Sequence, residues 1–146
     1  MTMRWFAIAA IAGAATLGTS GLLYAQSQSV WNGIYTAAQA DRGKALFMAN
    51  CAKCHGSNGE GSDEIPQLKG AHFMSDWDSQ TVADLVQRVH GTMPLDNPGA
   101  LNVTSATDVV AFLLQMNAVP AGTAELPPEP SMQSQFQIQA VNPKGT

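Results

Sequence analysis

The sequence predicts an all-α domain, and three observations lead to this class. Three segments carry apolar residues at three- and four-residue spacing, as one face of a helix requires. No segment alternates apolar and polar residues over the length of a strand. A Cys-x-x-Cys-His motif, Cys51–His55, directly follows the first helical segment and holds both cysteines of the chain. A small domain without disulfides has a thin core, so we expect the helices to pack around this motif.

The N-terminal segment, residues 1–25, reads as a secretory signal peptide. Arg4 supplies a positive start, residues 5–17 are apolar, and Ala25 is a small residue suited to cleavage. An uncleaved membrane anchor is the alternative, for which this apolar stretch is short and interrupted by Gly, Thr and Ser. The sequence therefore predicts export to the periplasm, with no stable membrane span after cleavage.

The charge balance argues against nucleic acid as a partner. The chain has 146 residues, with 7 Lys+Arg against 11 Asp+Glu and a formal net charge of -4. It contains no arginine-rich run or basic cluster that could neutralise a row of phosphates.

The first helix is expected to run from Ala37 to about Asn50. Thr36, with Gln39 three residues later, has the spacing of a capping box. A glycine in a helix interior costs about 1 kcal/mol relative to alanine. Gly43 therefore indicates a place where another helix approaches closely. The residues expected on the buried face of this helix are Ala40, Gly43, Leu46 and Phe47.

The second helix is expected after a loop over residues 56–70, which Gly and Pro punctuate. Thr81, with Asp84 three residues later, suits a helix N-terminus. The helix should end by Gly91, because Pro94 disfavours helical geometry at the residue before it.

The last helix is expected to begin around residues 104–107 and to continue to about Met116, apolar over most of its surface. The chain beyond Ala121 is rich in Pro, Gln and Ser, which predicts a tail that is poorly ordered or wrapped on the surface. We therefore divide the chain into a signal peptide (1–25), an N-terminal extension (26–36), the main domain (37–120) and a C-terminal tail (121–146).

The Cys51–His55 motif is the attachment signature of a c-type haem. The thiols of Cys51 and Cys54 can form thioether bonds to the two vinyl groups of one porphyrin, and His55 can bind the iron. A disulfide, a thiol redox pair and half of a zinc site are the alternatives. A zinc site would need two further ligands, and only His72 and His90 remain, far apart in the sequence. Covalent haem c is therefore the predicted cofactor.

Met93 is the predicted second axial ligand of the iron. Pro94 favours an extended Met93, and a loop in this conformation can lay a thioether over a flat ring. A thioether ligand favours ferrous iron and raises the reduction potential. His90 is the second candidate. The remaining candidates are Met116, for which core packing is favoured, and His72 and Met74, which we expect in a loop and at the pocket wall.

The surroundings of the haem can also be predicted. The second ring nitrogen of His55 needs an acceptor, and the carbonyl of Pro66 in the following loop can supply one. Leu68 is expected to form part of the haem wall. Lys53 and Lys69 are expected near the haem edge, where they meet acidic or propionate groups, or else are plain surface charges.

With these residues in place, the segment Ala37–Pro120 resembles the class I c-type cytochromes, small mono-haem electron carriers with His/Met ligation. The resemblance implies that the first and last helices cross at a glycine/aromatic contact. In this chain, that contact would place Gly43 and Phe47 against Phe112 and Leu113. In this family a proline carbonyl accepts a hydrogen bond from the ligand histidine, and the resemblance implies that Pro66 has this role. It likewise implies that Met93 is the thioether ligand.

A finer likeness concerns the segments Val30–Thr36, Thr92–Pro94 and Asn97–Leu101, which look like bacterial cytochromes that accompany periplasmic quinoprotein (PQQ) dehydrogenases. It implies an electron-transfer protein rather than an enzyme, with a periplasmic alcohol or sugar dehydrogenase as donor and a downstream cytochrome or oxidase as acceptor. Two alternatives are a cytochrome subunit held in a larger respiratory or dehydrogenase complex, and a haem enzyme or sensor in which Met93 is labile.

Overall fold

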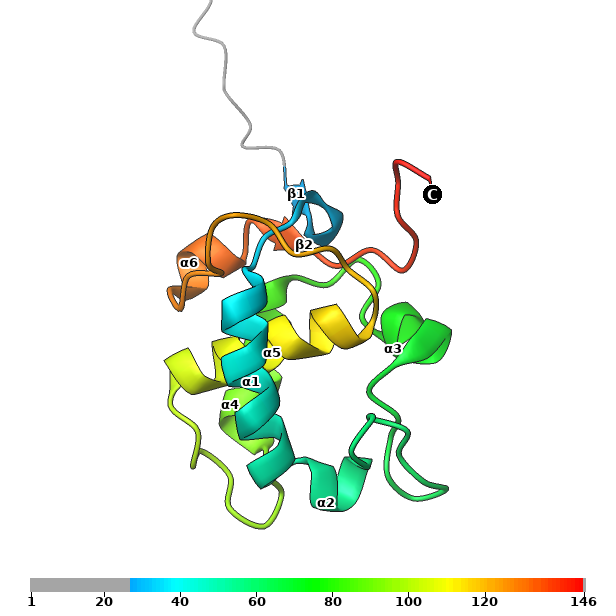
Figure 1. The fold of residues 1–146 in the computed structure, drawn as a ribbon, viewed down its shortest axis with the longest axis vertical. Coiled ribbons are helices and arrows are strands. Elements are labelled where there is room, and N and C mark those ends of the chain that lie inside the picture. The colour runs from blue at the N-terminus through cyan, green and yellow to red at the C-terminus, as the bar shows by residue number, and fades with distance from the viewer. Residues whose placement is uncertain (1–26, 146) are drawn as a thin grey trace, which may run out of the picture.

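The computed structural model describes residues 27–145, so the signal peptide expected over residues 1–25 lies outside the described residues. The elements follow one another as β1 (Gln28–Ser29), the 3₁₀ turn η1 (Val30–Asn32), α1 (Ala37–Asn50), α2 (Ala52–His55), α3 (Gly70–Asp76), α4 (Val82–Thr92), α5 (Val103–Met116), α6 (Pro130–Gln133) and β2 (Phe136–Gln137). The predicted all-α class is confirmed (Figure 1). Between residues 27 and 145, no helix combines the length and the apolar character needed to cross a bilayer.

The core of the domain is the crossing of α1 over α5 (Figure 1). A Cβ atom on Gly43 would lie 1.8 Å from the carbonyl oxygen of Asp108, so only glycine allows this approach. Beside it, the rings of Phe47 and Phe112 pack with centroids 5.3 Å apart and planes inclined by 59°. Tilted aromatic pairs of this kind are favourable beyond their buried area. The predicted glycine/aromatic contact between the first and last helices is therefore confirmed.

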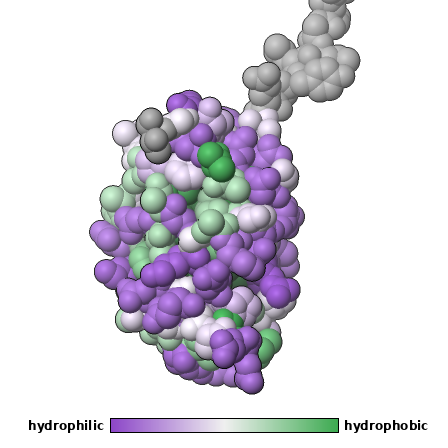
Figure 2. All heavy atoms as spheres, turned by 90° about the vertical axis from the view of Figure 1, so that its right-hand side faces the viewer, coloured by the Kyte–Doolittle hydropathy of each residue, from purple (hydrophilic) through white to green (hydrophobic). Residues whose placement is uncertain are grey.

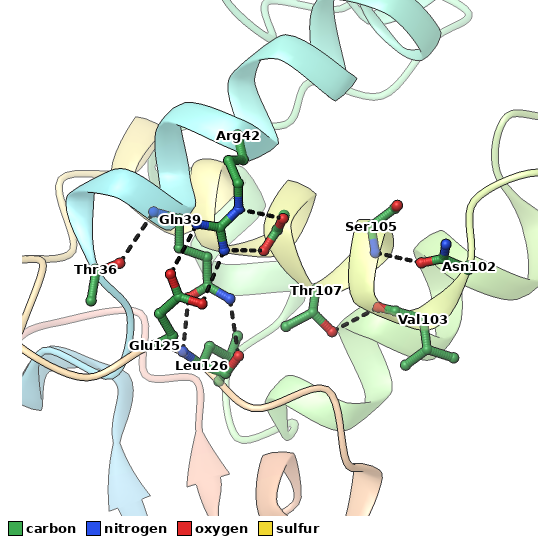
Figure 3. Close-up of polar contacts among 10 residues, drawn as sticks. Thr36, Gln39, Arg42, Asn102, Val103, Ser105, Thr107, Glu125 and Leu126 are labelled. Atoms are coloured by element: carbon green, nitrogen blue, oxygen red, sulfur yellow. Dashed lines mark hydrogen bonds and ion pairs between the residues drawn. The ribbon is translucent and has the colours of Figure 1, made fainter.

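The helices begin at the predicted cap residues, but Thr36 forms only half of the expected capping box, because the side chain of Gln39 binds the backbone of Leu126 instead. The side chain of Thr36 accepts a hydrogen bond from the third residue of α1 (Figure 3). At the start of α4, Thr81 and Asp84 form a complete capping box. Helix α4 ends at Thr92, one residue beyond the predicted end, and Met93 is extended with φ −120° and ψ 148°. The local effect of the following proline on backbone geometry is thus confirmed.

Helix α3 corrects the expectation that His72 and Met74 lie in a loop. The segment Gly70–Asp76 is helical and turns Phe73 and Met74 into the core, where they are 4% and 5% exposed. Seven residues are too few for a helical apolar pattern to stand out in the sequence. Figure 2 shows the side of the molecule on which α3 lies, and hydrophilic residues predominate over this face.

The C-terminal tail is an integral layer of the fold, so the prediction that it is poorly ordered is wrong and the wrapped alternative is correct. Leu126, Gln133 and Ile138 are each 1% exposed. Strand β2 pairs in parallel with β1, next to α6 and the start of α1 (Figure 1). The two-residue strands also correct the expectation of a strand-free chain. The buried anchors lie 5 to 7 residues apart in the sequence, which is a spacing that no regular period reveals.

Polar contacts bind the tail to the α1–α5 crossing (Figure 3). The side-chain amide of Gln39 donates to the carbonyl of Leu126 at 2.9 Å and accepts from its N–H at 2.7 Å. Arg42 pairs with Asp108 of α5 at 3.0 Å and with Glu125 of the tail at 2.9 Å. The two hydrogen bonds of Gln39 satisfy the backbone N–H and carbonyl of the buried Leu126, as burial requires.

The N-terminal extension packs against the same end of the domain. Val30 and Tyr35 are fully buried, and the hydroxyl of Tyr35 donates to the carbonyl of Val119 at 2.5 Å. Burial raises the pKa of Tyr35 to about 12. The indole of Trp31 donates to the carbonyl of Gln139 at 2.9 Å. The N-terminal extension and the C-terminal tail therefore contact each other, and these contacts stabilise the packing of both segments against the domain.

Candidate functional site

The cysteine motif forms a one-turn helix, α2, that continues directly from α1. The N–H of Cys51 donates to the carbonyl of Phe47 at 2.8 Å, and the N–H of His55 donates to the carbonyl of Cys51 at 3.0 Å. The two cysteines form no disulfide with each other; Cys51 is half-buried and Cys54 is exposed. In the polypeptide before haem attachment, burial and, to a lesser degree, the neighbouring Cys54 raise the pKa of the Cys51 thiol to about 11. The helix thus presents two thiols and one imidazole within five residues.

These side chains open onto a cavity of about 690 Å³. Cofactor sites commonly have a volume of roughly 300–1,000 Å³ and mostly apolar walls. Cys51, Cys54, His55 and Met93 all line this cavity. Its apolar walls come from α1, the loop before α3, α3, α4 and α5, and include Phe47, Leu68, Phe73, Trp77, Leu85 and Leu113. The volume, the apolar walls and the donor set fit a haem c with two thioether attachments and an imidazole and a thioether as iron ligands.

The orientation of His55 is set by the loop after the motif. Its Nδ1 lies 2.8 Å from the carbonyl oxygen of Pro66. A carbonyl only accepts hydrogen bonds, so Nδ1 carries the hydrogen and Nε2 is left free for a metal. The loop turns tightly at Gly61, whose φ is +64° and whose N–H donates to the His55 carbonyl at 2.8 Å. Leu68, further along this loop, is half-buried and lines the cavity.

Met93 lies at the cavity because α4 ends beside it. Its N–H donates to the carbonyl of Val89 at 3.1 Å, and its extended backbone leads into the loop before α5. Although Met93 is separated from His55 by 38 residues of sequence, both side chains line the same cavity.

The alternative ligands lie elsewhere. The Nδ1 of His90 is 2.7 Å from the carbonyl of Leu101, and the exposed His72 pairs with Asp76. Neither histidine lines the cavity, and the same holds for the buried Met74 and for Met116, which packs near Gly59. Met93 is therefore the candidate ligand that the fold brings to the site.

Several cavity residues were missed by the sequence reasoning. Trp77 and Arg88 line the cavity, but neither belongs to a motif, and no sequence signal could have found them. Of the two lysines expected near the haem edge, Lys53 lines the cavity and forms an ion pair with Asp96. Lys69 instead lines a smaller, open hollow of about 280 Å³ next to α5.

Comparison with known proteins places this chain in a family. Residues 38–113 match the family model described as cytochrome c oxidase, cbb3-type, subunit III. The chain belongs to this family. It is therefore a cytochrome c domain with covalently bound haem c, and the predicted cytochrome c fold and haem c cofactor are confirmed.

No curated protein matches the chain. Among solved structures, the chain is similar to a chain in the crystal structure of the sulfane dehydrogenase SoxCD from Paracoccus pantotrophus. The sequence identity is 30%, over 55% of this chain and 44% of that chain, with a TM-score of 0.44. This chain thus spans less than half the length of the matched chain.

Proposed function

We propose that this protein is a mono-haem electron-transfer cytochrome of the class I type, with His55 and Met93 as the axial ligands of its iron. The observation that carries the proposal is that the thiols of the Cys51–His55 motif and the Met93 thioether line one apolar cavity. When bound, haem c supplies a reversible one-electron change at its iron.

The proposed roles of the residues follow from their chemistry. Cys51 and Cys54 hold the macrocycle by thioether bonds. His55, with Nδ1 committed to the carbonyl of Pro66, offers Nε2 to the iron in a set orientation. Met93 offers a soft sulfur, which raises the potential relative to a nitrogen ligand. Leu68 contributes to the wall that excludes water, and a dry wall also tunes the potential.

Two occupied axial positions leave no site for a substrate, so we propose a carrier rather than an enzyme. Within this role we propose a periplasmic location after export. The donor would be a periplasmic dehydrogenase, including the quinoprotein (PQQ) type, and the acceptor a downstream cytochrome or oxidase. This choice of partners is supported by the likeness of residues 30–36, 92–94 and 97–101 to the cytochromes that accompany periplasmic quinoprotein dehydrogenases.

A cytochrome subunit held in a larger respiratory complex is the second candidate function. It is supported by the family description, which names a subunit of a cytochrome c oxidase. Copurification through salt washes separates the two roles, since a diffusing carrier washes off and a subunit stays with its complex.

The test of the carrier role is to add carbon monoxide to the reduced native protein and record the visible spectrum. A carrier with Met93 bound keeps its spectrum, whereas a shift would identify an enzyme or sensor with a labile methionine. Mixing the protein with reduced periplasmic dehydrogenases of the source cell and following haem reduction then identifies the donor.

A further inference from the structure

We propose that Lys53 and Asp96 are positioning residues that tie the loop carrying Met93 to the attachment helix and limit the rate at which Met93 leaves the iron. The proposal rests on the proposed function, because it takes Met93 to be the ligand. The two charged side chains form an ion pair, and both line the cavity.

The positions of the two residues in the chain give the pair its significance. Lys53 stands in α2, two residues before His55, whereas Asp96 stands three residues after Met93. The ion pair therefore joins the two segments that supply the two proposed axial ligands, and it does so at the surface of the molecule.

The loop after Met93 has few other attachments. Residues 95–100 are all exposed, and Leu95 is 78% exposed, so no buried side chain anchors this stretch. Its backbone hydrogen bonds are internal, from Asn97 to Pro94 and from Ala100 to Asn97. The next contact with another element is that of Leu101 with His90. Within the described residues, Lys53 is the one side chain of another element that forms a hydrogen bond or an ion pair with the loop between Met93 and Leu101.

The expected strength of this tie is modest. The side chains of Lys53 and Asp96 are 59% and 58% exposed, so solvent and salt screen the pair. An exposed ion pair changes an equilibrium or a rate by no more than about fivefold. An ion pair of this strength leaves the state with Met93 bound dominant, but it changes the rate at which the loop opens.

The test measures how fast imidazole, a neutral iron ligand, displaces methionine from the ferric holoprotein. At saturating imidazole the limiting rate reports the opening of the loop. We expect Lys53→Met and Asp96→Asn each to raise this rate about threefold to fivefold. The double variant should be no faster than either single variant, and the charge exchange Lys53→Asp with Asp96→Lys should restore the slower rate. Because the two single changes shift the net charge in opposite directions, a common acceleration cannot come from net charge.

Controls and salt dependence sharpen the test. Lys44→Met and Asp63→Asn change exposed charges outside the cavity lining and should leave the rate unchanged. Added salt should accelerate the wild type toward the rate of the variants and leave the variants unaffected. Unchanged rates in both single variants, additive effects in the double variant, or a charge exchange that does not restore the slow rate would overturn the proposal.

The two proposals can fail separately. The reduced wild type is examined first by NMR for the resonances of an iron-bound methionine. Where these are present and the rates do not change, the role of Lys53 and Asp96 is refuted and the carrier role stands. Where they are absent, Met93 is not the ligand and both proposals are refuted.

Discussion

The Nδ1 of His55 lies 2.8 Å from the carbonyl oxygen of Pro66, and this contact depends on a glycine between them. A Cβ on Gly61 would lie 2.4 Å from the carbonyl oxygen of Ile65, and the φ of Gly61 is +64°. The short loop can therefore return to the histidine only with glycine at this position.

We predict that Gly61→Ala destabilises the protein and loosens His55. A left-handed residue other than glycine costs about 1–2 kcal/mol, and the clash with the loop backbone adds to it. Gly99→Ala is the matched control, because Gly99 also has a positive φ, of +79°, but nothing lies within 4 Å of its Cβ position. The denaturation midpoint and the reduction potential are measured. Equal losses in both variants would contradict the role of the clash.

Gly43→Ala is expected to destabilise the α1–α5 crossing. The added methyl would lie 1.8 Å from the Asp108 carbonyl, so the helices must separate, at a cost of about 1–3 kcal/mol for overpacking. In α4, a Cβ on Gly91 meets only the flexible end of Gln87 at 3.1 Å. Gly91→Ala should therefore raise the free energy of unfolding by part of the roughly 1 kcal/mol difference in helix propensity between glycine and alanine. Urea unfolding tests this prediction: the free energy of unfolding should fall in Gly43→Ala and rise in Gly91→Ala. An unchanged free energy in Gly43→Ala would refute it.

Met93→Ala is expected to lower the reduction potential and to abolish the signals of a methionine bound to iron. The loss of a soft ligand that favours ferrous iron should be on the order of 0.1 V, within the roughly 0.8 V that axial ligands span. Met116→Ala and Met74→Ala serve as controls and should retain both properties. If Met93→Ala retains them, the ligand is one of the other methionines.

Deletion of residues 124–146 is expected to lower stability without altering the haem spectrum at low temperature. The deletion removes the buried Leu126 and Ile138, and each buried side chain of this size contributes about 1.5–3 kcal/mol. Among the described residues, none beyond Leu113 lines the cavity, so the haem surroundings should persist. Deletion of residues 142–146 alone is the control and should change neither property. The thermal midpoint and the visible spectrum test both statements.

Glu125 is expected to make the fold sensitive to acid. The hydrogen bond from Arg42 holds the pKa of Glu125 below its ordinary value of 4.5. A folded-state pKa that is lowered contributes stability above the unfolded-state pKa, and this contribution is lost as the pH falls through the folded-state value. The thermal midpoint of the wild type should therefore fall more steeply than that of Glu125→Gln between pH 7 and about pH 3. Parallel pH profiles would contradict the prediction.

Local features of the fold could be predicted because they depend on neighbouring residues. The cap at Thr36, the capping box at Thr81 and the extended Met93 before a proline each follow from interactions within about four residues. The attachment motif also needs no tertiary information, because its chemistry is contained in five consecutive residues. These parts of the structure could therefore be predicted from local sequence alone.

Which distant residues share the cavity, and which segments belong to the fold, depends on tertiary packing. Trp77, Arg88 and Asp96 reach the site through the packing of α3, α4 and the loop after it, and their spacing carries no signal. The tail reads as polar and irregular, yet it is held by isolated anchors such as Leu126, whose partners lie far away in the sequence. Contacts of this kind join residues that are far apart in the sequence. Whether they form depends on the free energy of the whole fold, which no local sequence pattern reveals.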